Sequence, residues 1–357
     1  MVTRDEFAAI NDGDQLDDGY FNGINNKLWV SLIKTDINVF VQHAQSIVKS
    51  DEVLWTSLSS TLSNGAIDET NSTALVGGAA DNSKAIYFCT KFDDFEDASI
   101  DSTKWSTSTA GEGTVTESGG FINAYAGDLL AAPETGTATV ISDGSSGLDF
   151  RSFSGNSEVV FYYEITDSST GNGTTTTQIQ ISNGTTHVDT TLTGSGYARI
   201  IFNKTGETCD IYADDGASLL QNDLDISSVT TNWYIRLSCF GNVPSNPGTA
   251  TSRIKLQEIG YVDGSTGSST AIFTDTAAST TATGLAVIET SNTTSTPVIG
   301  FSADSGANFV TDSNENLINT SNTGTGIQFR ITGDHPTTIS ATSKNIMRLD
   351  KFGGIYG

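Results

Sequence analysis

Apolar and polar residues alternate along most of this chain, which is the pattern of half-buried β-strands. In the segment SEVVFYYEI, the residues Val159, Phe161, Tyr163 and Ile165 fall on one face. The same alternation recurs in TQIQIS, YARIIFN, WYIRLSCF and RIKLQEIGY, with Gly, Asn and Asp turns between the segments. So many short strands between residues 86 and 264 predict two antiparallel sheets packed face to face.

A different pattern occurs near the N-terminus. Apolar residues between Tyr20 and Val48 are spaced alternately three and four apart, as at the a and d positions of a helical heptad. Two interpretations fit: a single amphipathic helix that lies on a neighbouring surface, or self-association of helices, most simply as a homotrimer. The seam consists of Val30, Ile33, Ile37, Phe40, Ala44 and Ile47.

Changes in composition divide the chain into four parts. Residues 1–62 form an N-terminal arm and helix, and residues 63–85 read as a linker because they are rich in Gly, Ser, Asn and Thr. The sandwich follows at residues 86–264, and further short strands at residues 265–357 predict a smaller C-terminal β-sandwich. The expected fold class is therefore mainly β.

The charge balance excludes several classes of partner. The chain carries 42 acidic and 17 basic residues, a formal net charge of −25. Nucleic acid and anionic lipid surfaces both need basic neutralisation, so neither is an expected partner. The chain opens without an apolar signal-peptide core, and no stretch reaches the roughly 18 apolar residues of a membrane span, so membrane insertion is not expected.

One stretch resembles a known family. FDDFEDASIDSTKWSTS at residues 92–108 is similar to the opening of concanavalin A-like and laminin-G-like jelly rolls, in which an acidic phrase leads through Ser-Ile-Asp to a Trp. Later strands at 196–216, 232–241 and 252–264 fit the same family. The resemblance covers residues 86–264, about half the chain, and implies a jelly-roll sandwich.

The last part of the chain resembles a second group of proteins. The run that starts at Gly300 and ends at Thr332 is similar to small β-sandwich modules at the ends of phage tail and head fibres, and DGDQL near the N-terminus resembles their attachment segments. These resemblances imply a fibre or decoration protein on the virion surface, held by other virion proteins through its N-terminal region and in contact with host-surface carbohydrate. The alternatives are a free lectin-like carbohydrate-binding module and a polysaccharide depolymerase.

No constellation for catalysis is apparent. Glycoside hydrolysis needs two carboxylates that face one cleft, whereas Glu158 and Glu164 have Val160 and Tyr162 between them on the same face and are expected to be solvent-facing charges at a sheet edge. The three histidines stand apart from any nucleophile pattern, so an enzyme is not expected and no cofactor is implied. They are His43, His187 and His335.

No metal is expected, and calcium is the one metal for which the sequence offers candidate ligands. Asp93, Asp94, Glu96 and Asp97 cluster beside the first strand of the sandwich, where related jelly rolls hold calcium; the alternative is a solvated acidic turn. The cysteines, which lie in apolar stretches far apart in sequence, are expected to be buried thiols, although one disulfide remains an alternative. They are Cys89, Cys209 and Cys239.

The ligand-binding residues are not identifiable from the sequence. Aromatic side chains that stack on sugars look the same in sequence as aromatic side chains of the core. Three of them, Trp105, Tyr125 and Trp233, are candidates for either role, and the core is the expected place of each.

Overall fold

The computed structural model describes the sandwich regions and a few short pieces before them. Strands are the only regular elements among the described residues, and none of these residues form a helix that could cross a membrane. The described residues are 15–17, 27–29, 45–46, 65–67, 71–73, 75–76, 86–213, 218–275, 281–291, 297–312, 317–324, 326–335, 339–340 and 344–356.

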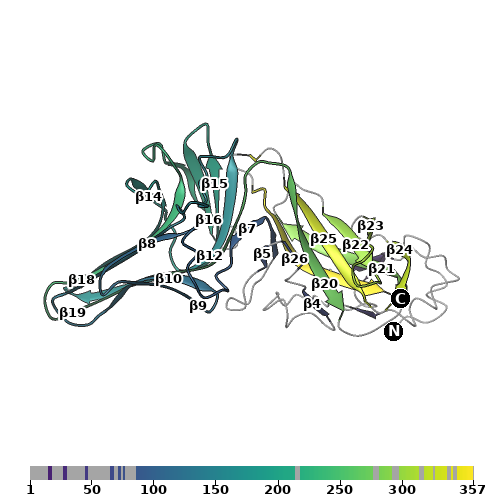
Figure 1. Ribbon diagram of the computed structural model, residues 1–357, viewed down its shortest axis with the longest axis horizontal. Coiled ribbons are helices and arrows are strands. Elements are labelled where there is room, and N and C mark those ends of the chain that lie inside the picture. Colours follow the sequence, from purple (N-terminus) through teal and green to yellow (C-terminus); the bar gives the residue numbers. More distant parts are fainter. Residues whose placement is uncertain are drawn as a thin grey trace. The chain divides into compact units, whose positions relative to one another are not determined.

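The chain forms two compact units that are interleaved in sequence. The central unit comprises residues 91–265 and 336–346, and the terminal unit comprises residues 1–90, 266–335 and 347–357. The predicted mainly β architecture with two antiparallel sandwiches is confirmed (Figure 1).

Two antiparallel sheets build the central unit. The larger sheet has the order β17-β16-β15-β12-β19-β10-β9, with β7 also paired to β19, and the smaller sheet has the order β14-β13-β18-β11-β8. The strands are β7 (Thr90–Asp93), β8 (Ser106–Gly111), β9 (Thr114–Ser118), β10 (Phe121–Leu129), β11 (Glu134–Ile141), β12 (Ser157–Gly171), β13 (Thr174–Ser182), β14 (His187–Asp189), β15 (Ser195–Asn203), β16 (Thr208–Ala213), β17 (Ser218–Asp225), β18 (Tyr234–Val243) and β19 (Gly248–Val262).

Alternate residues of both sheets fill one shared core. Ile179 of β13 and Leu237 of β18 face Phe161 of β12 and Ile254 of β19, and all four are fully buried. Burial of this many aliphatic and aromatic side chains is the main favourable contribution to folding, at roughly 25 cal/mol per Å² of apolar surface. The three cysteines are free buried thiols, as the sequence predicted.

The terminal unit is a second sandwich. Its sheets have the orders β23-β22-β25-β20-β4 and β24-β21-β26-β6-β5, with β3 paired to β26. Phe301 and Phe329 meet in its core with ring centroids 5.0 Å apart. The strands are β3 (Gln45–Ser46), β4 (Gly65–Ile67), β5 (Leu75–Val76), β6 (Ile86–Phe88), β20 (Gly267–Asp275), β21 (Thr281–Ser291), β22 (Val298–Ser302), β23 (Val310–Asp312), β24 (Leu317–Gly324), β25 (Gln328–His335) and β26 (Met347–Tyr356).

The predicted boundaries before residue 91 need correction. The expected linker, residues 63–85, contains β4 and β5, which pair with β20 and β6. Within it, the hydroxyl of Ser72 accepts a hydrogen bond from the backbone N–H of Ile272 at 3.0 Å. β6 pairs with β26 of the terminal unit and therefore does not begin the central sandwich. Polar composition suggested a linker, but backbone pairing does not depend on composition.

The predicted N-terminal helix is described only in part. Where the structure describes residues 20–48, at β2 (Lys27–Trp29) and β3, they form strands instead of the predicted helix; β2 pairs with β1 (Gln15–Asp17). The seam residues Val30, Ile33, Ile37, Phe40, Ala44 and Ile47 lie outside the described residues.

A buried ion pair attaches a late segment of the chain to the central unit. Glu158 of β12 and Arg199 of β15 are fully buried and 3.1 Å apart. The Glu158 carboxylate accepts backbone hydrogen bonds from Asn345 at 2.5 Å and Ile346 at 3.0 Å, while Arg199 donates to the carbonyl of Ile346 at 3.0 Å. Glu158 was expected at a solvent-facing sheet edge; instead β12 lies between β15 and β19, in the sheet interior.

Removal of the Arg199 cation should destabilise the central unit strongly. We expect Arg199→Met to lower the free energy of unfolding by about 3–5 kcal/mol, because a buried carboxylate loses its counter-charge. The matched control is Lys255→Met, which breaks the partly exposed 2.6 Å pair with Glu164 and should cost about 1 kcal/mol or less. Chemical denaturation of the full chain measures both; equal effects would contradict this account.

Candidate functional site

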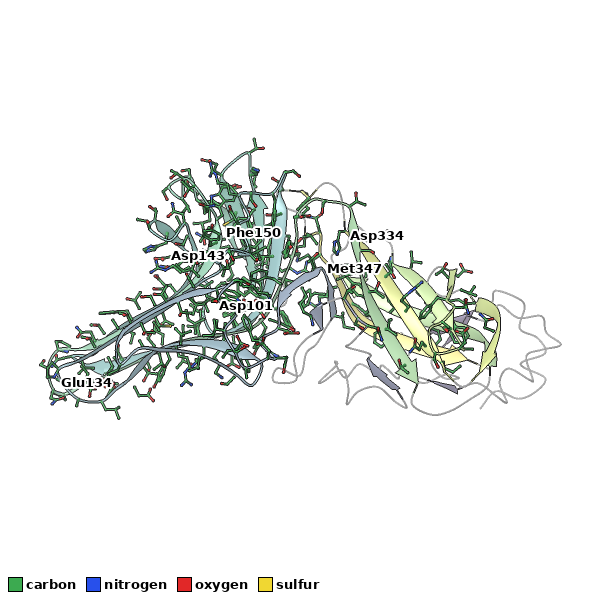
Figure 2. The ribbon with its side chains drawn as sticks, viewed as in Figure 1. Asp101, Glu134, Asp143, Phe150, Asp334 and Met347 are labelled. Atoms are coloured by element: carbon green, nitrogen blue, oxygen red, sulfur yellow. The ribbon has the colours of Figure 1, made fainter. Side chains whose placement is uncertain are left out.

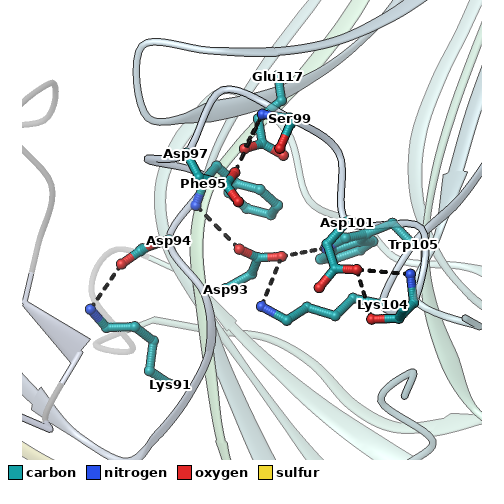
Figure 3. Close-up of polar contacts among 11 residues, drawn as sticks. Lys91, Asp93, Asp94, Phe95, Asp97, Ser99, Asp101, Lys104, Trp105 and Glu117 are labelled. Atoms are coloured by element: carbon teal, nitrogen blue, oxygen red, sulfur yellow. Dashed lines mark hydrogen bonds and ion pairs between the residues drawn. The ribbon is translucent and has the colours of Figure 1, made fainter. Parts of the chain in front are cut away.

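The acidic turn predicted to bind calcium is held by its own hydrogen bonds (Figure 3). Asp93 is buried, and one of its carboxylate oxygens accepts a hydrogen bond from the indole N–H of Trp105 at 2.7 Å and lies 3.5 Å from the Lys104 ammonium. The other oxygen accepts the backbone N–H of Phe95 at 3.3 Å. The acidic phrase and the Trp of the predicted jelly-roll opening are therefore joined as a structural unit.

The remaining calcium candidates point to separate partners. Asp94 pairs with Lys91 at 3.0 Å, Asp97 accepts the backbone N–H of Ser99 at 3.3 Å, and the carboxylate of Glu96 lies beside Gly120. No group of three or more acidic, His or Cys side chains converges as a metal site among the described residues. The structure thus brings the four candidates into one turn without a converging set of ligands.

A proton can be shared between two carboxyl groups here, Asp97 of the turn and Glu117 of the neighbouring strand. A hydrogen bond joins Asp97 to Glu117 of β9, and Glu117 also accepts the backbone N–H of Ser99 at 3.2 Å. Burial, together with the hydrogen bond and negative charge of Asp97, raises the pKa of Glu117 to about 7. The hydrogen bonds from Glu117 and Ser99 lower the pKa of Asp97.

Stability should depend on pH through Glu117. Because its folded pKa lies above the ordinary value of 4.5, the native state binds this proton more tightly than the unfolded chain, and stability falls as pH rises from 4.5 to about 7. We expect Glu117→Gln to remove a difference on the order of 2 kcal/mol between pH 5 and pH 8. Thermal unfolding across this range measures it, with the exposed Glu112→Gln as control; an unchanged pH profile in Glu117→Gln would disprove the shared proton.

The three aromatic candidates separate into two environments. Trp105 and Trp233 are 1% and 0% exposed and belong to the core, as expected. Tyr125 of β10 is half-buried on the outer side of the eight-stranded sheet, with the Arg253 guanidinium 4.4 Å from its ring centroid. The expectation of a core position is therefore wrong for Tyr125, because outward residues of a strand also become partly covered by long neighbours.

The outer side of the five-stranded sheet presents a continuous polar surface, here called the five-stranded face. It consists of the outward side chains of β14, β13, β18, β11 and β8, and it runs along the strands between the neighbourhood of Asp143 and that of Glu134 (Figure 2). One row of register-paired positions crosses all five strands: Asp189, Gln180, Arg236, Ile141 and Ser106.

Hydrogen bonds hold the centre of this row but leave two groups unpaired. Arg236 Nη1 lies 2.9 Å from His187 Nδ1, and Gln180 Nε2 donates to Asp189 at 2.6 Å. Gln180 is only 2% exposed, yet its Oε1 atom and the neighbouring Arg236 Nε are buried without a hydrogen-bond partner in the described structure. Burial lowers the pKa of Arg236, and the charge of Asp189 opposes that shift.

The rest of the five-stranded face is neutral, with one exposed aromatic ring. Along β18, Ser238 follows Arg236 on the same side, and Phe240 comes next, 37% exposed and opposite Thr137 and Thr176. Four residues of strand separate Arg236 from Phe240 by about 13 Å. An extended ligand could therefore contact the polar row and the aromatic ring together.

Sequence reasoning did not single out Gln180 or Arg236. His187, which was considered as an isolated histidine, lies beside Arg236. His335 contacts the Ser269 hydroxyl at 2.7 Å in the terminal unit, and His43 lies outside the described residues. A signal was present in TQIQIS, where two Gln residues alternate with core Ile residues.

Comparison with known proteins gives only distant similarities. No known protein-family model matches the chain, and no curated protein matches it. Among solved structures, a sialidase is 9% identical over 52% of this chain and 21% of its own, with a TM-score of 0.29. The Lotus tetragonolobus seed lectin is 10% identical over 48% of this chain and 97% of its own, with a TM-score of 0.28. Peanut lectin is 10% identical over 44% of this chain and 92% of its own, with a TM-score of 0.25. The chain thus spans about a fifth of the sialidase's length, and similarities this distant carry no further conclusion.

Proposed function

We propose that the chain is a carbohydrate-binding module that holds a neutral sugar on the five-stranded face. The observation that carries this proposal is the pair of unpartnered buried atoms, Gln180 Oε1 and Arg236 Nε, at adjacent register positions. A buried polar group without a partner costs roughly 1–3 kcal/mol, and a ligand that pairs with it recovers that energy.

A sugar hydroxyl has the chemistry that this pair lacks. A hydroxyl donates one hydrogen bond and accepts others, so it donates to Gln180 Oε1 and accepts from Arg236 Nε. The Ser and Thr side chains that continue the face offer further hydroxyl contacts, and Phe240 offers an apolar ring on which a sugar ring can stack. In this proposal the ligand is bound and not cleaved, since Glu158 is buried against Arg199 and Glu164 is paired with Lys255.

Substitution of the central row should weaken sugar binding. We expect Arg236→Met and Gln180→Met each to weaken the best neutral oligosaccharide from an array by about tenfold or more, because each removes one buried hydrogen bond. Arg253→Met, on the opposite sheet, is the matched control and should leave neutral-sugar binding unchanged. Calorimetric titration measures the affinities; wild-type affinity in Arg236→Met would refute the site.

We also propose, from the sequence resemblances alone, that this module is carried on a virion fibre or decoration protein. In this setting the N-terminal seam would trimerise the chain or dock it on other virion proteins, and the face would contact host-surface glycans. We expect Ile33→Asn combined with Ile37→Asn to convert a trimer into a monomer in light scattering, because polar residues at two apolar seam positions oppose self-association through that seam. A monomeric wild-type chain would argue against self-association.

A further inference from the structure

The outer side of the eight-stranded sheet carries a second polar cluster on the opposite side of the central unit. Its centre is Arg253 of β19, which pairs in register with Tyr125 of β10 and Thr166 of β12. Lys255 follows two residues later on the same side of the strand. Two adjacent cations are unusual for a chain with 42 acidic and 17 basic residues.

The Arg253 guanidinium is held over an aromatic ring, with the negative charge of Asp128 in its neighbourhood but no direct ion pair among the described residues. The Cζ atom of Arg253 lies 4.4 Å from the ring centroid of Tyr125. Among the described residues the guanidinium forms no ion pair and no hydrogen bond, and its Nε is buried. The ring beneath it is fixed in turn, because the Tyr125 hydroxyl bonds Asp128, which accepts a hydrogen bond from Thr251 at 3.0 Å. The guanidinium is therefore a preorganised donor without a direct ion-pair partner in the described structure.

The neighbours of Arg253 are a lysine that is already paired with a carboxylate and an uncharged amide. Lys255 lies 4.9 Å from the ring centroid of Phe121, and Glu164 neutralises it at 2.6 Å. Asn123, which pairs in register with Lys255, has a buried Oδ1 atom without a partner in the described structure. The cluster thus combines a guanidinium that has no direct ion pair with a buried carbonyl oxygen that has no hydrogen-bond donor, on adjacent strands of the described structure.

We propose that this cluster is a second saccharide site, which takes the carboxylate of an acidic sugar such as a uronate on Arg253 and a sugar hydroxyl on Asn123. The planar guanidinium matches a carboxylate through two parallel hydrogen bonds. A peptide carboxylate fits less well, because β19 is paired on both sides and leaves no backbone edge for a peptide to join.

The test compares an acidic oligosaccharide with its neutral form. We expect trigalacturonate to bind the full chain about tenfold more tightly than its methyl ester in calorimetric titration, since the ester keeps the rings but loses the charge. Arg253→Gln should reduce the acid to the affinity of the ester. Arg236→Gln, on the five-stranded face, is the matched control and should preserve the preference for the acid even if neutral-sugar binding is lost, so the two sites fail separately.

Several results would overturn the assignment. Equal affinities for acid and ester, or an unchanged preference in Arg253→Gln, would show that Arg253 does not bind the carboxylate. Arg253→Lys keeps the charge without the two-pronged geometry and should lose at least about threefold in affinity; wild-type affinity would contradict bidentate binding. An Asp-Asp-Asp peptide or inorganic phosphate that binds as tightly as trigalacturonate would show that the site does not select a saccharide.

Discussion

The buried Glu158–Arg199 pair is the interaction on which the arrangement of the chain depends. Both charges are withdrawn from water, and such a pair is tolerated only when its remaining hydrogen-bonding capacity is also satisfied. That capacity is met by the backbone of Asn345 and Ile346, almost 190 residues after Glu158. Residues 336–346 therefore belong to the central unit although β25 before them and β26 after them belong to the terminal unit. Neither sandwich is a continuous stretch of sequence as a result.

This arrangement divides the outer surface of the eight-stranded sheet. Near the start of β12, the outward residue Glu158 is covered by the returning segment and serves stability. Thr166, eight residues later on the same strand and about 27 Å away, lies beside the half-buried Arg253 and Tyr125. One sheet can thus hold a structural ion pair at one end and leave polar groups accessible at the other, because the strands are much longer than the segment that covers them.

The sequence predicted whatever depends on local periodicity. Alternation identified the strands and their inward faces, and the resemblance at residues 92–108 led to the turn in which Asp93 holds Trp105. The core positions of Trp105 and Trp233 were expected only because most aromatic side chains lie in the core. Features that depend on strand order were missed. Glu158 looked solvent-facing because its neighbours β15 and β19 are distant in sequence, and Gln180 and Arg236 looked like ordinary outward residues because their unpaired atoms arise only when β13 and β18 pair. Residues 63–85 were read as a linker because short strands such as β5 carry little periodic signal.

The two outer faces differ in the hydrogen-bond donors and the nearby charges of their central arginines, Arg236 and Arg253. At physiological ionic strength charges more than about 8 Å apart are largely screened, so a ligand responds mainly to nearby groups and much less to the net charge of the chain. Arg236 has the negative charge of Asp189 nearby and already contacts His187, so its unpaired Nε–H can donate to a neutral hydroxyl oxygen without a further counter-charge. Arg253 lies over an uncharged ring, with Asp128 in its neighbourhood but no direct hydrogen bond or ion pair among the described residues, so its two-pronged donor edge is left for an anion. Two arginines on the same fold are thereby suited to different sugars by their immediate neighbours.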